Sequence, residues 1–164
     1  MIRWIMLMSI VGTAAAATGT SANAGEIAII PTAFLCFILL FCSAFFSSAE
    51  TALFGLQPVD LEAMSGKREQ NVRKLLEEPR QTLASILIGN ETVNIALSTV
   101  SAGLLLQLFP DEPWLNIVIV APILLIFGEV LPKTFAFRFA PLLAPRSAQL
   151  LHPFAKLVAP IRFI

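Results

Sequence analysis

The sequence predicts an all-α membrane protein with three transmembrane helices, kinked or broken in places, and an amphipathic juxtamembrane helix on the cytoplasmic side. Of the 164 residues, 57% are hydrophobic and only 13% are charged, whereas a soluble domain has about 25% charged residues. Three apolar runs each approach the roughly 20 residues that cross a bilayer. The net charge is zero and basic residues form no dense block, so nucleic acid is not an expected partner.

Residues 1–24 have the layout of a secretory signal peptide. Arg3 precedes an apolar stretch from Trp4 to Val11, and small residues ending in Ala-Asn-Ala follow. The apolar stretch is too short to span a bilayer. We therefore expect cleavage after Ala24 and a transmembrane domain in residues 25–140.

The three spans are predicted at about residues 27–54, 82–109 and 114–136. The first contains no charge from Ile27 to Ala49, and the second is apolar on both sides of a polar interruption. The apolar part of the third ends at Phe127, so it reaches spanning length only if the helix continues toward Pro132. Pro122 and Pro132 predict kinks or breaks in this span.

The distribution of Lys and Arg predicts the orientation. Residues 57–80 carry five basic residues and the tail from Phe135 carries four, while the turn at 110–113 carries none. Basic loops stay in the cytoplasm, so we expect a multi-pass protein of the inner (plasma) membrane with its N-terminus outside and its C-terminus inside. Residues 141–164 are predicted to be a basic amphipathic juxtamembrane segment lying on the membrane surface.

Each predicted span contains polar residues at a depth where lipid favours apolar ones. They are Ser43, Ser47, Ser48 and Glu50 in the first span, Asn90, Glu91 and Asn94 in the second, and Glu129 beside Gly128 in the third. A charged side chain at mid-bilayer costs roughly 2.5–3.5 kcal/mol and is by default a functional-site hypothesis. Asn90 and Asn94 are four residues apart and share one helix face, while Glu91 is rotated by about 100°.

These side chains form an all-oxygen ligand set. Hydroxyl, amide and carboxylate oxygens, with carbonyls freed near Pro132, suit hard cations such as calcium, magnesium, manganese or sodium. The single histidine, His152, lies in the tail, and Cys36 and Cys42 lack metal-ligand spacing. A structural interpretation stands beside this one, because Ser and Asn in membrane helices also bond to neighbouring helices. Glu50 and Glu91 fit either interpretation.

An enzyme is a further alternative. Ser47 or Ser48 together with Lys133 would imitate a Ser–Lys dyad. Lys133, however, follows Leu-Pro at the cytoplasmic end of the third run, where its ammonium would reach the headgroups. We therefore expect no enzymatic activity.

Three motifs carry a family resemblance. "SAFFSSAETAL" (43–53), "IGNETVNIA" (88–96) and "GEVLPKTFA" (128–136) resemble, in order, the signatures of the transmembrane domain of the CorC/CNNM (cyclin M) family. The resemblance implies magnesium transport or efflux by a homodimer through alternating access, with an inward-open acidic cavity and sodium as a candidate coupling ion. It implies an ion site of Ser43, Asn90, Asn94, Gly128 (by its carbonyl) and Glu129, with Ser47, Glu50, Glu91 and Pro132 in support.

The resemblance also bears on regulation. Members of the family normally continue into a paired CBS module that binds ATP, and this chain stops at Ile164 without one. We expect such a module downstream in the full-length protein, and no ATP binding by these residues. The alternative function is a magnesium-sensing regulatory or scaffold membrane protein that binds the ion without transporting it.

Overall fold

The computed structural model describes residues 22–63, 67–112 and 114–158, and that part of the chain contains helices and no strand. The first half comprises α2 (Ala22–Phe54), α3 (Pro58–Ala63), α4 (Lys67–Glu77) and α5 (Pro79–Leu108). The second half comprises η1 (Asn116–Val120), α6 (Ala121–Ile123), η2 (Leu124–Val130), α7 (Leu131–Arg138) and α8 (Ala140–Val158). The prediction of an all-α protein is confirmed. Residues 1–21, most of the predicted signal peptide, lie outside the described residues.

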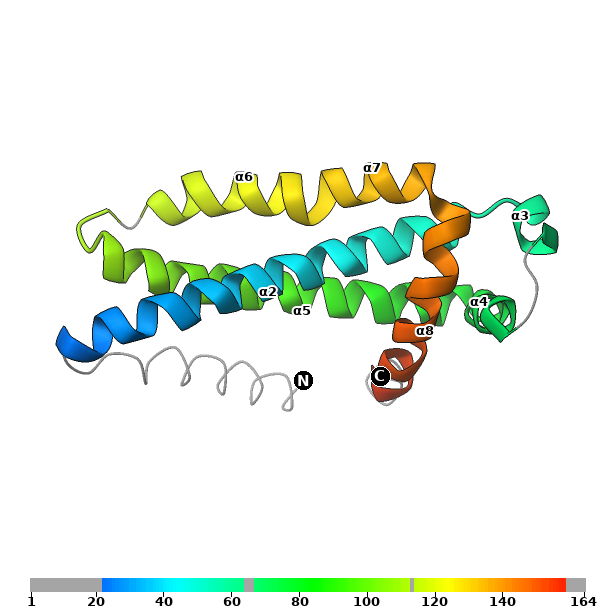
Figure 1. Cartoon of the computed structure of the whole chain (residues 1–164), viewed down its shortest axis with the longest axis horizontal. Coiled ribbons are helices and arrows are strands. Elements are labelled where there is room, and N and C mark those ends of the chain that lie inside the picture. Colours follow the sequence, from blue (N-terminus) through cyan, green and yellow to red (C-terminus); the bar gives the residue numbers. More distant parts are fainter. Residues whose placement is uncertain (1–21, 64–66, 113, 159–164) are drawn as a thin grey trace.

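Among the described residues, three helical stretches are long and apolar enough to cross a membrane, as predicted. They cover Ile29–Phe54 in α2, Pro79–Leu108 in α5, and Asn116–Arg138, which runs without interruption from η1 to α7. The three run side by side along the long axis of the molecule (Figure 1). Large apolar side chains such as Phe34, Phe37 and Phe41 are exposed on α2, as suits a surface that faces lipid rather than water.

α2 is the central helix of the bundle. It packs against α5, against the third span through η2 and α7, and against α8. Its buried residues near the contact with α8 are mostly small or aliphatic, including Ala49, Ala52 and Leu53. Small side chains let helix backbones approach closely, which is the main source of helix association in lipid.

The third span stays helical through both of its prolines. Pro122 and Pro132 each follow a stretch of π-helix, η1 and η2 respectively. A proline has no N–H for the carbonyl four residues earlier and its ring clashes with that carbonyl. The wider π turn relieves this conflict: at the end of η2, the N–H of Leu131 bonds to the carbonyl of Ile126, five residues back. The helix is therefore widened before each proline and is not broken there.

α8 lies across one end of the bundle, near α4 (Figure 1). It buries Ala144, Ala148 and Leu151 in the core that it shares with α2 and α4, and it exposes Leu150 and Arg146. It contacts α5 closely at Gly89, where an added methyl group would lie 2.9 Å from the Phe154 ring and 2.6 Å from the Phe46 ring. We call this end of the molecule the α8 end, and the end that carries the turn after Leu108 the turn end.

Candidate cation site between the three spans

The first contact between polar residues of different spans joins α2 to α5. The Ser43 hydroxyl donates to the Asn94 side-chain oxygen at 2.6 Å, and Ser43 is fully buried. The third span reaches the same point through Gly128, where an added methyl group would lie 2.9 Å from the Ser43 Oγ. Ser43, Asn94 and Gly128 therefore form one layer, to which all three spans contribute.

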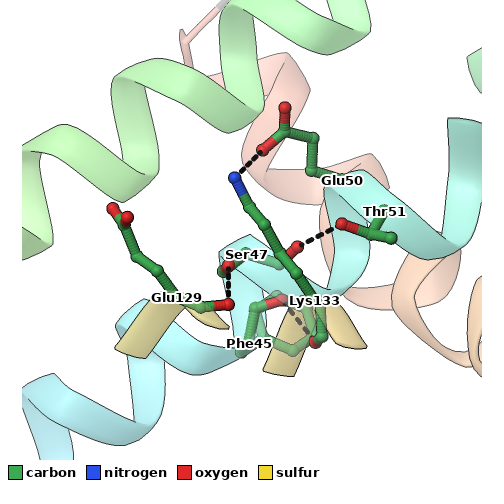
Figure 2. Close-up of polar contacts among 7 residues, drawn as sticks. Phe45, Ser47, Glu50, Thr51, Glu129 and Lys133 are labelled. Carbon is green, nitrogen blue, oxygen red and sulfur yellow. Dashed lines mark hydrogen bonds and ion pairs between the residues drawn. The ribbon is translucent and has the colours of Figure 1, made fainter. Parts of the chain in front are cut away.

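The second layer lies one helical turn nearer the α8 end. The Ser47 hydroxyl, also fully buried, donates to the backbone carbonyl of Glu129 at 3.3 Å (Figure 2). Because α2 and α5 pack against each other in opposite directions, the Ser43–Asn94 contact puts Asn90 at the level of Ser47. The side-chain oxygen of Asn90 is buried and has no hydrogen-bond partner within the described part of the chain.

An orphaned buried oxygen is unusual. Leaving a buried polar group unsatisfied costs about 1–3 kcal/mol, and each such group in a native structure calls for a physical explanation. Asn90 lies at the level of the layer that holds the Ser47 hydroxyl and the Glu129 carbonyl. An electropositive ligand between the spans would satisfy it.

The third layer is an ion pair. The Lys133 ammonium lies 3.5 Å from the Glu50 carboxylate, and the two side chains are 43% and 25% exposed respectively. Glu50 follows Ser47 by three residues on α2, and Lys133 follows Glu129 by four residues on the third span. Both intervals return to the same helix face, so the pair lies next to the second layer, on its α8 side (Figure 2).

Glu129 presents its carboxylate away from the Ser47 contact. Figure 2 shows the carboxylates of Glu129 and Glu50 and the ammonium of Lys133 extending to the same side, above Ser47 in that view. Glu129 is half-buried inside a membrane-spanning stretch, and among residues 22–63, 67–112 and 114–158 it has no ion-pair partner. A carboxylate at membrane depth requires a compensating charge.

Two of the predicted supporting residues lie apart from these contacts. Glu91 is exposed on the surface of α5, as its rotation from Asn90 suggested. Pro132 is half-buried and acts through the backbone, because it cannot donate the N–H that Gly128 would accept in a regular α-helix. Ser43, Ser47, Asn94, Gly128 and the Glu129 backbone are brought together, and Asn90 lies at their level.

The hydroxyls that would serve a Ser–Lys dyad are bonded elsewhere. Ser47 donates to the Glu129 carbonyl, and Ser48 donates to the Phe45 carbonyl at 2.9 Å. Lys133, expected to extend to the headgroups, is instead paired with Glu50. The sequence did not predict this pair. Glu50 and Lys133 each lie one turn beyond a predicted ligand, but this spacing alone does not show that the two side chains meet.

Beyond the first layer, toward the turn end, the contact between spans is mostly apolar. An open groove of about 270 Å³ is lined by side chains of all three spans, among them Leu40, Leu97 and Ile123. Ser101 also lines it and donates to the Asn116 side-chain oxygen at 3.1 Å. The polar layers therefore continue toward the α8 end, and a largely apolar region separates them from the turn end.

The chemistry of the layers suits a hard cation. The donors are hydroxyl, amide and backbone carbonyl oxygens, with the Glu129 carboxylate alongside. In the described part of the chain, no three His, Cys, Asp or Glu residues gather into a group that could hold a metal ion, so a site here would rely on neutral oxygens with few charges. Calcium, magnesium and manganese take such oxygen ligands.

Comparison with known proteins gives the family. The sequence model described as "CNNM: Cyclin M transmembrane N-terminal domain" matches residues 34–164, which include all three polar layers. The chain is also 35% identical over 126 residues to the UPF0053 inner membrane protein YfjD of Escherichia coli, covering 73% of this chain and 29% of that protein.

Two further relatives resemble the chain to a similar extent. A UPF0053 protein of Haemophilus influenzae is 33% identical over 142 residues, covering 80% of this chain and 33% of the relative. The UPF0053 protein sll1254 of Synechocystis is 28% identical over 112 residues, covering 63% of this chain and 31% of the relative. The chain thus spans about a third of the length of these relatives.

Proposed function

The chain belongs to the cyclin M (CNNM) transmembrane family, and from this premise we propose that it moves magnesium ions across the membrane through the polar layers between its three spans. The observation that carries the proposal is the convergence of oxygen atoms at membrane depth. Ser43 and Asn94 meet at 2.6 Å, Gly128 packs against Ser43, and Ser47 reaches the Glu129 backbone. Polar groups at this depth, with the Glu129 carboxylate among them, are by default a functional-site hypothesis.

Two further observations favour a cation over a purely structural hydrogen-bond network. A structural network would satisfy its own members, yet the Asn90 oxygen is buried without a partner and the Glu129 carboxylate has no ion pair within the described residues. A divalent cation would supply both the missing partner for Asn90 and the missing charge for Glu129. Gly128 would contribute its carbonyl, which Pro132 leaves without its α-helical donor.

Transport by alternating access requires the site to face one side at a time. The polar layers lead toward the α8 end, and the spans meet mostly through apolar side chains on the way to the turn end, where the apolar groove lies. We place the α8 end in the cytoplasm and the turn end outside, in the inner membrane, because the basic residues gather in α4, α7 and α8. In this arrangement the site exchanges ions with the cytoplasm, and outward access requires the apolar contacts between the spans on the turn side to separate.

We also propose that the chain works as a homodimer. Glu91 is exposed on α5 in the middle of a membrane-spanning stretch, where lipid would solvate a carboxylate poorly. Ser98, two helical turns further along α5 and on the same side as Glu91, is also exposed. A second copy that covers this side of the helix would remove Glu91 from lipid.

Magnesium flux into vesicles tests the transport proposal. The chain is reconstituted into liposomes that contain a magnesium-sensitive dye, and uptake is recorded with and without a sodium gradient. We expect uptake above that of empty vesicles, and faster uptake with sodium on the opposite side if sodium is the coupling ion. Tight magnesium binding without any flux would instead support the sensor or scaffold function.

A further inference from the structure

The Glu50–Lys133 ion pair lies beside the candidate ligands without being part of them. It joins α2 to α7 at 3.5 Å, one helical turn from the Ser47–Glu129 contact. A positive charge so near a cation site would oppose the binding of a cation. A lysine whose only role was to join α2 to α7 would weaken the neighbouring cation site. We therefore expect Lys133 to have a further role.

Lys133 is also a neighbour of Glu129 on its own helix. The two are four residues apart, with the acid nearer the N-terminus, which is the favourable order for an ion pair along a helix. A lysine carries its charge on a flexible four-carbon stem. In the view of Figure 2, the Lys133 ammonium lies between the Glu129 and Glu50 carboxylates, and its ion pair is with Glu50.

The charged groups of Glu50, Glu129 and Lys133 can pair in two ways. When no cation is bound, the Glu129 carboxylate needs a counter-charge at membrane depth, and the Lys133 ammonium is the adjacent candidate. When a divalent cation occupies the layers, it repels the ammonium, and Glu50 receives it. The 3.5 Å pair of the structure shows that the Glu50 carboxylate can hold the ammonium, as this second arrangement requires.

We propose that Lys133 is a tethered counter-cation, shared between Glu50 and Glu129, which competes with the transported divalent ion for Glu129. This inference rests on the proposed function and names a residue that sets how tightly the site holds its ion. Glu50 favours ion binding by holding Lys133 away from Glu129. Release of the ion is favoured when Lys133 returns to Glu129, because the carboxylate is then never left unpaired.

Opposite effects of two neutralising variants test the inference. Magnesium dissociation constants are measured by calorimetry on the detergent-purified chain. Lys133→Met removes the competitor, and we expect binding about fivefold tighter than in the wild type, the lower end of typical coupling between sites. Glu50→Gln frees Lys133 to pair with Glu129, and we expect binding about fivefold weaker. The double variant lacks the competitor, so it should bind as tightly as Lys133→Met.

Two controls separate this competition from simpler effects. Lys74→Met removes one positive charge from an exposed position on α4 and should leave the dissociation constant unchanged, because solvent screens that charge. If Glu50→Gln does not fold, Glu50→Asp shortens the side chain by one methylene and should weaken magnesium binding in the same direction.

The outcomes distinguish this inference from the proposed magnesium transport on which it rests. Magnesium binding by the wild type, with unchanged or equally weakened binding in both single variants, would overturn the role of Lys133 and leave the site intact. A purely structural pair predicts that result, with lower melting temperatures in both variants. A wild-type chain that does not bind magnesium at all would overturn the site and this inference together.

Discussion

Gly128 shows at the scale of one residue how the spans are matched to each other. The Ser43 Oγ is fixed on one side by its 2.6 Å bond to Asn94, and an added methyl group at Gly128 would approach it to 2.9 Å from the other side. Real Cβ atoms essentially never lie that close to a neighbour. A glycine is needed here because two backbones approach closely, a role that small residues often have between membrane helices.

The first prediction concerns the replacement of Gly128 by alanine. Gly128→Ala should push Ser43 away from Asn94 and weaken magnesium binding about tenfold or more, equivalent to ~1.4 kcal/mol. The dissociation constant is measured by calorimetry. Gly103→Ala is the matched control, because an added methyl group there meets nothing within 4 Å, and it should bind magnesium as the wild type does. Equal affinity in both variants would contradict the close packing of the first layer.

The types of residue in the candidate site could be predicted from the sequence. The contacts between residues of different helices could be predicted less well. Hydroxyls, amides and a carboxylate inside apolar runs are visible in the letters alone, and the four-residue spacing of Asn90 and Asn94 gives their shared face. The pairing of Glu50 with Lys133 depends on how two helices are rotated about their axes. That rotation is set by packing across the bundle, and no local pattern in either helix contains it.

The third span illustrates what one element contributes. Its two prolines predicted kinks or breaks, and the structure has π-helical stretches before each of them in a helix that continues. Hydrogen bonding that shifts from four to five residues accommodates the proline ring. The sequence indicates where the regular helix must be disturbed, but the choice between a break and a wider turn depends on the neighbouring spans.

The second prediction concerns Pro132→Ala, a substitution that restores a regular helix at this position. Pro132→Ala supplies the N–H that Gly128 would accept, so the Gly128 carbonyl becomes less available to an ion. We expect weaker magnesium binding together with an unchanged or higher melting temperature, since an internal proline costs a helix about 3 kcal/mol or more. Pro122→Ala is the control and should leave affinity unchanged, because Pro122 lies in the half of the span that is nearer the turn end. Unaltered affinity in Pro132→Ala would argue against a role for this carbonyl.

The docking of α8 is the subject of the third prediction. Gly89→Ala would place a methyl group 2.6 Å from the Phe46 ring and 2.9 Å from the Phe154 ring, so α2, α5 and α8 cannot keep their present contact. Overpacking of this kind typically costs about 1–3 kcal/mol. Thermal unfolding in detergent should show a lower melting temperature than that of the wild type. Gly103→Ala, which has open space around it, should show no loss.

For the architecture of the whole molecule, the composition of the sequence was the strongest indication of a membrane protein. The number of spans follows from the lengths of the apolar runs, and residues 22–63, 67–112 and 114–158 contain three such helices. The position of α8 across the end of the bundle was not predictable, because it depends on Ala144, Ala148 and Leu151 finding partners on α2 and α4. An amphipathic segment contains its apolar face in its sequence, but not the identity of the surface that covers this face.

The fourth prediction concerns the orientation of the chain in the membrane. In a background without Cys36 and Cys42, Gln107→Cys places a thiol at the exposed end of α5, and Lys74→Cys places one on exposed α4. With the turn end outside, a membrane-impermeant maleimide should label position 107 in intact cells and position 74 only after permeabilisation. The reverse pattern would invert the proposed topology, and with it the direction in which the polar layers open.

The central claim is that the three spans together hold a divalent cation, with Glu129 as its charged ligand. The most direct test compares magnesium binding to the detergent-purified wild type, to Glu129→Gln and to Glu91→Gln. Both variants lose one carboxylate from a membrane-spanning helix, but only Glu129 adjoins the polar layers, whereas Glu91 is exposed on α5. We predict that Glu91→Gln binds as the wild type does and that Glu129→Gln binds at least about tenfold more weakly. Equal magnesium affinity in the wild type and Glu129→Gln would contradict the account.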